Sequence, residues 1–202
     1  MDVLYGVEGM TDEALVKRLL SEFGLTPVRA HAGGGRTRLD PKVARWNATS
    51  NKQQMFVLRD WDADDRVTCP QELVEKVAGG SIVQPKLLLR IPVRAMESWI
   101  LADCSAVRSY FKVKSSAATP DGESNPKQRL IEMCVHSRSK AIQSDMVPKT
   151  GSRSKVGPGY LRRIEEFSEK AWDPSRARTR SQSLDRCMSR IEHLISTGVW
   201  IT

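Results

Sequence analysis

Residues 3–13 read VLYGVEGMTDE, a short apolar run that passes directly into an acidic segment able to start a helix. The run Val3–Val7 is continuous in the way that is typical of a strand buried on both faces of a sheet. Thr11 offers a side-chain oxygen that can cap a helix, and Asp12 and Glu13 suit the positive end of that helix. A buried strand leading into a helix predicts an α/β fold.

The same alternation continues through the first half of the chain. Apolar residues recur at helical spacing as far as Phe23, and Gly24 ends that helix. Three more strands are expected at residues 25–32, 55–58 and 86–93, with helices at residues 40–46 and 68–77. Because strands alternate with helices, we expect a mostly parallel sheet flanked by helices.

The second half of the sequence predicts helices. One is expected over residues 96–111 with a break near Asp103, and another ends near His136. Two amphipathic helices form the C-terminal end, and a basic, Gly/Ser/Pro-rich loop is expected over residues 137–159. The apolar stripes of these helices are interpreted as core or interface.

Charge divides the chain unequally. Residues 1–111 hold 15 Lys and Arg against 14 Asp and Glu, whereas residues 112–202 hold 17 against 10. We therefore expect an acid-containing core at 1–111, with a basic, mainly helical part, 112–202, packed on it as one structural unit. A basic part attracts polyanions such as nucleic acid, although a soluble domain with one basic face fits the charge equally well.

Several classes of protein are disfavoured by the sequence. The four cysteines lie singly, as do the three histidines, so no zinc or redox motif is expected. The N-terminus lacks a basic-then-apolar leader, and no apolar stretch is long enough to span a bilayer. We expect a soluble, cytoplasmic protein without membrane contact.

Carboxylates follow three of the predicted strands. They are Glu8 after the first strand, Asp60 and Asp62 after the strand at residues 55–58, and Glu97 after the strand at residues 86–93. The carboxyl ends of parallel strands lie along one edge of a sheet, where ligands bind near the switch in strand order. We therefore expect these side chains to converge.

Converging carboxylates need a cation. Two like charges about 4 Å apart repel by roughly 4 kcal/mol at an effective dielectric constant near 20. Oxygen ligands of this kind suit Mg²⁺ or Mn²⁺, which also bind phosphate. The pattern favours a metal site that acts on a nucleic-acid phosphodiester bond.

Each acid also has a structural interpretation. Asp64 and Asp65 fit a solvated turn, Asp103 fits a helix N-cap better than a metal ligand, and Glu97 fits an ordinary first helical turn. Taken singly, these interpretations are preferred. The recurrence of acids after successive strands favours the metal site.

Two segments resemble the motifs of the Toprim domain. Val7–Glu13 is similar to its first motif, a glutamate and glycine between strand and helix, and Asp60-Trp61-Asp62 is similar to its later Asp-x-Asp motif. Toprim domains occur in topoisomerases, bacterial primases and OLD-family nucleases, where these acids hold Mg²⁺ at a phosphodiester. With Glu97–Asp103 and Lys155–Ile164, nearly the whole chain resembles the Toprim-like family called domain of unknown function 4276.

The resemblance implies a role for particular residues. Glu8, Asp60 and Asp62 would be metal ligands, and Asp12 with Glu97 would help to hold a second metal ion. Lys155, or less favourably Arg153, would supply a cation near the scissile phosphate; a basic loop that only touches the nucleic-acid backbone is an equal alternative.

The resemblance implies a Toprim-like (Rossmann-like) catalytic core at residues 1–111. It also implies a metal-dependent nuclease acting on DNA or RNA, with Mg²⁺ or Mn²⁺ as cofactor. Relatives are often encoded beside an ATPase in phage-defence loci, which implies an ATPase partner. Topoisomerase chemistry is disfavoured because no tyrosine is suitably placed, and a primase needs domains that this length excludes. The alternatives are a non-catalytic nucleic-acid-binding subunit and a regulator of an ATPase. A homo-oligomer is left open.

Overall fold

The structure is a computed structural model. It describes residues 1–49, 53–61, 67–80, 82–114 and 119–200.

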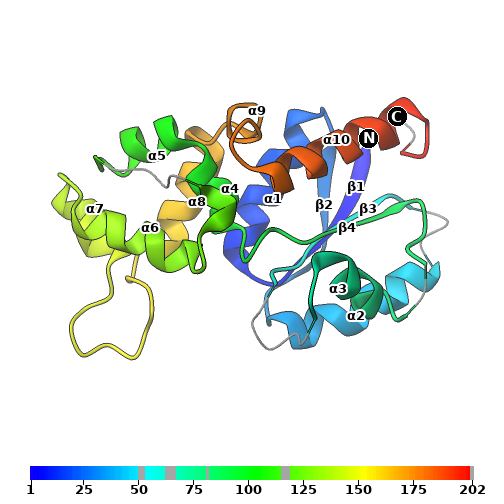
Figure 1. The fold of residues 1–202 in the computed structure, drawn as a ribbon, viewed down its shortest axis with the longest axis horizontal. Coiled ribbons are helices and arrows are strands. Elements are labelled where there is room, and N and C mark those ends of the chain that lie inside the picture. Colours follow the sequence, from blue (N-terminus) through cyan, green and yellow to red (C-terminus); the bar gives the residue numbers. More distant parts are fainter. Residues whose placement is uncertain (50–52, 62–66, 81, 115–118, 201–202) are drawn as a thin grey trace.

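A four-stranded parallel sheet forms the centre of the fold (Figure 1). Its strands are β1 (Asp2–Val7), β2 (Thr26–Ala32), β3 (Met55–Leu58) and β4 (Leu87–Arg90), in the order β2-β1-β3-β4. Every pairing is parallel. The prediction of an α/β fold with a mostly parallel sheet flanked by helices is confirmed.

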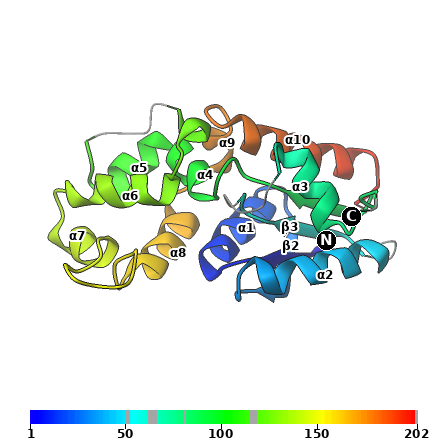
Figure 2. The ribbon, with the colours of Figure 1, turned by 60° about the horizontal axis from the view of Figure 1, so that its bottom comes forward.

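Helices cover both faces of the sheet (Figures 1 and 2). One face carries α1 (Met10–Glu22) and α10 (Gln182–Ser196), and the other carries α2 (Arg36–Thr49) and α3 (Pro70–Val77). Strand residues alternate between two cores: Leu88 packs with α1 and α10, whereas Leu87 and Leu89 pack with α2 and α3. This alternation explains the continuous apolar runs in the sequence.

The close fit of α2 depends on one glycine. A Cβ added at Gly6 in β1 would lie 2.6 Å from the Trp46 ring. The indole therefore packs directly on the strand backbone, and this face of β1 requires glycine at that position.

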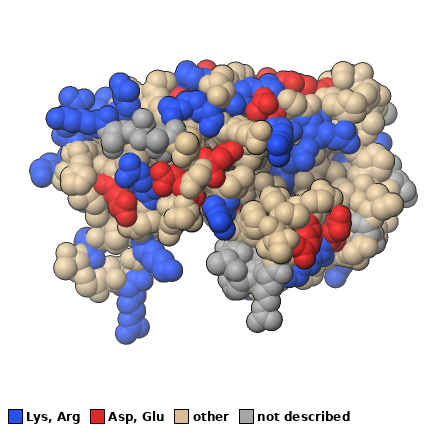
Figure 3. All heavy atoms as spheres, in the orientation of Figure 1, with Lys and Arg blue, Asp and Glu red and all other residues tan. Residues whose placement is uncertain are grey.

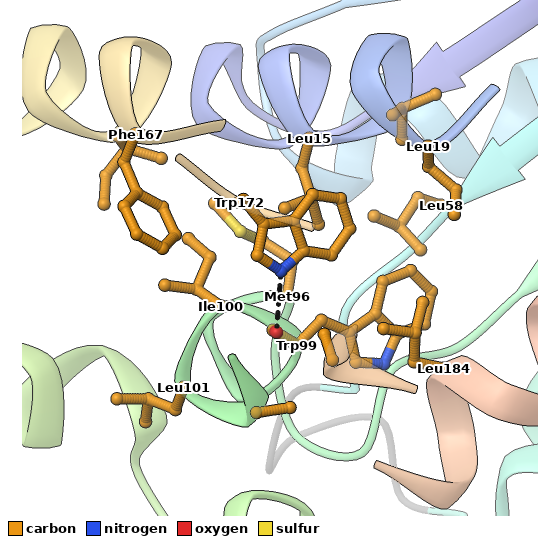
Figure 4. Close-up of a cluster of buried hydrophobic side chains, with 14 of the residues drawn as sticks. Leu15, Leu19, Leu58, Met96, Trp99, Ile100, Leu101, Phe167, Trp172 and Leu184 are labelled. Atoms are coloured by element: carbon orange, nitrogen blue, oxygen red, sulfur yellow. Dashed lines mark hydrogen bonds between the residues drawn. The ribbon is translucent and has the colours of Figure 1, made fainter. Parts of the chain in front are cut away.

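The remaining helices form a lobe beside the sheet (Figure 1). They are α4 (Glu97–Ala102), α5 (Cys104–Tyr110), α6 (Pro126–Val135), α7 (Lys140–Met146), α8 (Tyr160–Lys170) and α9 (Pro174–Ala177), with a 3₁₀ turn at Pro120–Gly122. Figure 4 shows Trp99 and Trp172 at the centre of the junction, where Trp172 Nε1 donates to the Trp99 carbonyl across 3.1 Å. Residues from both sides of the expected boundary at 111/112 share this cluster, and the boundary itself stays a prediction.

Three predicted elements differ from the structure. The first helix begins at Met10 with Gly9 as its N-cap, not at Thr11, because the Asp12 carboxylate accepts a hydrogen bond from the Gly9 N–H. The second helix begins at Arg36 rather than Asp40 and contains Pro41. The expected loop at residues 137–159 contains α7, which Ser139 caps by accepting from the Ile142 N–H.

The four cysteines are free thiols. In the described ranges, no helix combines the length and the apolar character needed to cross a membrane.

Candidate functional site

The strand order reverses direction between β1 and β3. From β1 the chain passes first to β2 on one side, then to β3 and β4 on the other. Such a switch point leaves a crevice at the carboxyl ends of the two strands, where α/β proteins bind ligands. Glu8 follows β1 directly, and Asp60 follows β3 after Arg59.

Glu8 and Asp60 meet at this crevice. The Asp60 N–H donates to Glu8 Oε1 across 3.0 Å, and Asp60 Oδ1 accepts from the Met96 N–H at 3.1 Å. Burial, together with the charges of Asp12, Glu97 and Glu8, raises the pKa of Asp60 well above its usual range. Carboxylates from the β1–α1 segment and from the start of α4 therefore act on Asp60.

Asp12 reaches the same cluster from the first turn of α1. Its side chain is buried, and Oδ2 accepts from the Gly9 N–H at 2.8 Å. Burial, followed by repulsion from Glu97, raises the pKa of Asp12 to about 7. An acid in this position holds a proton near neutral pH unless a cation replaces it.

Glu97 lies at the start of α4 and is fully buried. Its Oε1 accepts from the Tyr160 hydroxyl at 2.8 Å and lies 3.2 Å from Lys127 Nζ. Its Oε2 is buried without any hydrogen-bond partner. A carboxylate oxygen in that state is costly, and it is the strongest sign in the cluster of a missing ligand.

Lys127 and Tyr160 were not recognised from the sequence. Glu97, and then Asp60 and Asp12, raise the pKa of Lys127 against the opposing effect of its burial. Burial, together with Glu97, raises the pKa of the Tyr160 phenol. One signal was available: Lys127 lies in the first turn of α6, where a cation opposes the helix dipole.

A buried arginine forms an ion pair with Glu8. Arg59 is 1% exposed, and its Nε lies 3.4 Å from Glu8 Oε1 while Nη2 lies 3.2 Å from Asp40 Oδ2. Arg59 also donates to the carbonyl of Asp60. Because the guanidinium contacts both strand-end acids, it fixes the turn that carries them.

The predicted metal ligands thus have different outcomes. Glu8 accepts from the Asp60 N–H, and Asp12 and Glu97 lie near enough for their charges to act on Asp60, while Asp62 lies outside the described residues, as do Asp64 and Asp65. Their roles as ligands stay predictions.

The other predicted residues lie elsewhere. Lys155 and Arg153 are exposed in the loop that joins α7 to α8, and neither forms an ion pair with a described acid. Asp103 caps α5, accepting from the Ala106 N–H at 3.2 Å, and pairs with Arg176. The N-cap interpretation of Asp103 is therefore confirmed.

The candidate donor set has the chemistry that a hard divalent cation prefers. It contains only carboxylate oxygens, two of its acids have raised pKa values, and one oxygen of Glu97 has no partner. Among the residues that the structure describes, no group of three or more His, Cys, Asp and Glu side chains is close enough to enclose a metal ion. Completion of the site would require Asp62, a bound phosphate or water.

Comparison with known families identifies the chain. Residues 7–192 match the family described as "Domain of unknown function (DUF4276)". The chain belongs to this family. The match begins at the end of β1 and ends within α10, so it includes every described acid of the cluster.

One solved structure is similar to this member of the DUF4276 family. It is the C-terminal region of the Burkholderia pseudomallei OLD protein, with 15% sequence identity and a TM-score of 0.49, covering 95% of this chain and 97% of that one. Among curated proteins, no sequence gave a significant match.

Proposed function

We propose that this DUF4276 protein is a Toprim-like, metal-dependent nuclease that hydrolyses phosphodiester bonds in nucleic acid. One observation carries the proposal: Glu8, Asp12 and Glu97 all act on Asp60 at the switch point, where Glu97 Oε2 is buried without a partner. Such a cluster is unfavourable unless protons or cations neutralise it.

Glu8, Asp12, Asp60 and Glu97 would hold Mg²⁺ or Mn²⁺, with Asp62 as a further ligand. When bound, the cation supplies charge neutralisation and polarisation at the phosphodiester. Arg59 fixes Glu8, and the Tyr160 hydroxyl orients Glu97 by donating to Oε1. Lys127, 44% exposed beside Glu97, is able to contact a phosphate from the solvent side. Lys155 and Arg153 remain proposed phosphate contacts.

A metal-titrated cleavage assay tests the proposal. Single- and double-stranded DNA and RNA are incubated with Mg²⁺ or Mn²⁺ and either the wild-type protein or Glu8→Ala or Asp60→Ala. We expect metal-dependent cleavage by the wild type alone. Glu169→Ala, which removes an exposed acid from α8, is the matched control. Equal cleavage by a folded Asp60→Ala protein would overturn the proposal.

A second candidate is a nucleic-acid-binding subunit without catalytic activity. The excess of basic residues in 112–202 favours it. It predicts salt-sensitive binding that is unchanged by EDTA and by Asp60→Ala. An ATPase partner and a role in phage defence are proposed only from the resemblance of the motifs.

A further inference from the structure

A basic cavity, separate from the acid cluster, lies at the same edge of the sheet. It has a volume of about 310 Å³ and lies between the end of β4, the start of α3 and the side of α10. Its polar lining includes Arg90, Arg186, Gln71 and Ser183. No acidic side chain of the described chain lines it, so its formal charge comes from two arginines.

Arg90 is unusual because it is half-buried and no described carboxylate pairs with it. It is the last residue of β4, and its Nε has no hydrogen-bond partner. No described acid forms an ion pair with it, although neighbouring Arg59 has two such pairs. Burial lowers the pKa of Arg90, an effect that Cys187 partly offsets and Arg190 reinforces. A guanidinium whose Nε is buried without an acceptor is unfavourable.

The nearby acids on α10 are already occupied. Asp185 and Glu192 both pair with Arg178, at 2.8 and 2.6 Å. Arg186 and Arg190 have no ion pair to a described acid. They lie one helical turn apart, and repulsion between two like charges at this spacing destabilises a helix. Figure 3 shows Lys and Arg side chains gathered over α10.

We propose that this cavity binds a phosphate group, held by Arg90 and Arg186 with help from Gln71. Arginine suits this ligand because its planar donors match phosphate oxygens. That the phosphate belongs to a nucleic-acid backbone rests on the proposed function. Arg90 is paired in register with Leu58, two residues before Asp60, so the cavity adjoins the acid cluster along the sheet edge. One strand of nucleic acid can therefore contact both.

The test uses the full chain in EDTA, where metal-dependent cleavage cannot occur. Inorganic phosphate is titrated against chloride at equal ionic strength, and the melting temperature is measured. We expect phosphate to stabilise the wild type, and Arg90→Met and Arg186→Ala to lose this effect. Arg108→Ala, an exposed residue of α5, is the control. An absent effect, or one retained in both variants, would overturn the site.

A labelled oligonucleotide identifies the source of the phosphate. Arg186→Ala is expected to weaken binding roughly tenfold and to lower the salt slope by about one. Loss of the phosphate effect with unchanged oligonucleotide binding would overturn the nucleic-acid source and assign the cavity to a free phosphate. Neither measurement depends on cleavage, so failure of this site is distinguishable from failure of the nuclease proposal.

Discussion

The N–H of Asp60 donates to Glu8 Oε1 across 3.0 Å, which joins the ends of two strands separated by 52 positions in sequence. The bond places both acids at the switch point of a parallel sheet. Asp60 is also close enough to Asp12 and Glu97 for their charges to raise its pKa. The cluster is therefore a repulsive arrangement held together by the fold.

Asp60→Asn tests that repulsion. Without metal at pH 8, we expect the variant to melt at the same temperature as the wild type or higher, because one of the repelling charges is gone. Added Mg²⁺ should raise the melting temperature of the wild type and should have little effect on the variant. A lower melting temperature of the variant in EDTA, with normal stabilisation by Mg²⁺, would contradict the electrostatic argument.

Asp12 predicts how the stability of the metal-free protein depends on pH. Its folded-state pKa is about 7, above the unfolded value near 4, so the folded state binds the extra proton between these limits. Stability should therefore fall as pH rises from about 4 to 7, by a few kcal/mol at most. Denaturant unfolding in EDTA measures this. Asp12→Asn should flatten the slope, and an unchanged slope would refute the assignment.

Tyr160→Phe tests the support of Glu97. The change removes the hydroxyl that donates to Oε1 at 2.8 Å and leaves a buried carboxylate with one donor fewer, at a cost of about 1–3 kcal/mol. Metal affinity should also fall, because Glu97 loses its orientation. Tyr110→Phe is the matched control: its hydroxyl donates to Glu166, also at 2.8 Å, away from the cluster. Equal effects of both changes on metal binding would reject the role of Tyr160.

Much of the fold and site could be predicted because periodicity and strand ends are local signals. The apolar run at β1 predicts a strand, and Glu8 follows it directly. Its position at the sheet edge can therefore be predicted without knowledge of distant residues. Lys127 and Tyr160 could not be predicted in the same way, since α6 and α8 reach the cluster through tertiary packing. Their spacing in sequence resembles that of any amphipathic helix.

The short helix α7 could not be predicted for a related reason. The helix α7 buries only Ile142 and Met146, which is too small an apolar pattern to recognise within a basic segment. The Ser139 hydroxyl caps its start by accepting a hydrogen bond from the Ile142 N–H. Arg90 ends the strand that the apolar run predicts, but its position beside Arg186 of α10 depends on tertiary packing.

Asp103 is a structural acid whose surroundings differ from those of the proposed metal ligands. It is fully buried and accepts from Arg176 Nε and Nη2 at 2.7 and 2.6 Å, and from the N–H groups of Asp173 and Ala106. These donors hold its pKa below the usual range although burial opposes them, unlike the raised pKa of Asp60. Its contribution to stability is therefore present above pH 4 and is lost as pH falls below it.

Asp103→Asn should lower the free energy of unfolding by about 2–4 kcal/mol, because it disrupts a buried ion pair and weakens a helix cap. The stabilisation that Mg²⁺ confers should be unchanged, since all described partners of Asp103 are protein donors. Arg176→Gln should have a similar but smaller effect, because the arginine is 46% exposed. Denaturant unfolding with and without Mg²⁺ measures both quantities. Loss of the Mg²⁺ effect in Asp103→Asn alone would place Asp103 among the metal ligands and would require a larger site than the cluster around Asp60.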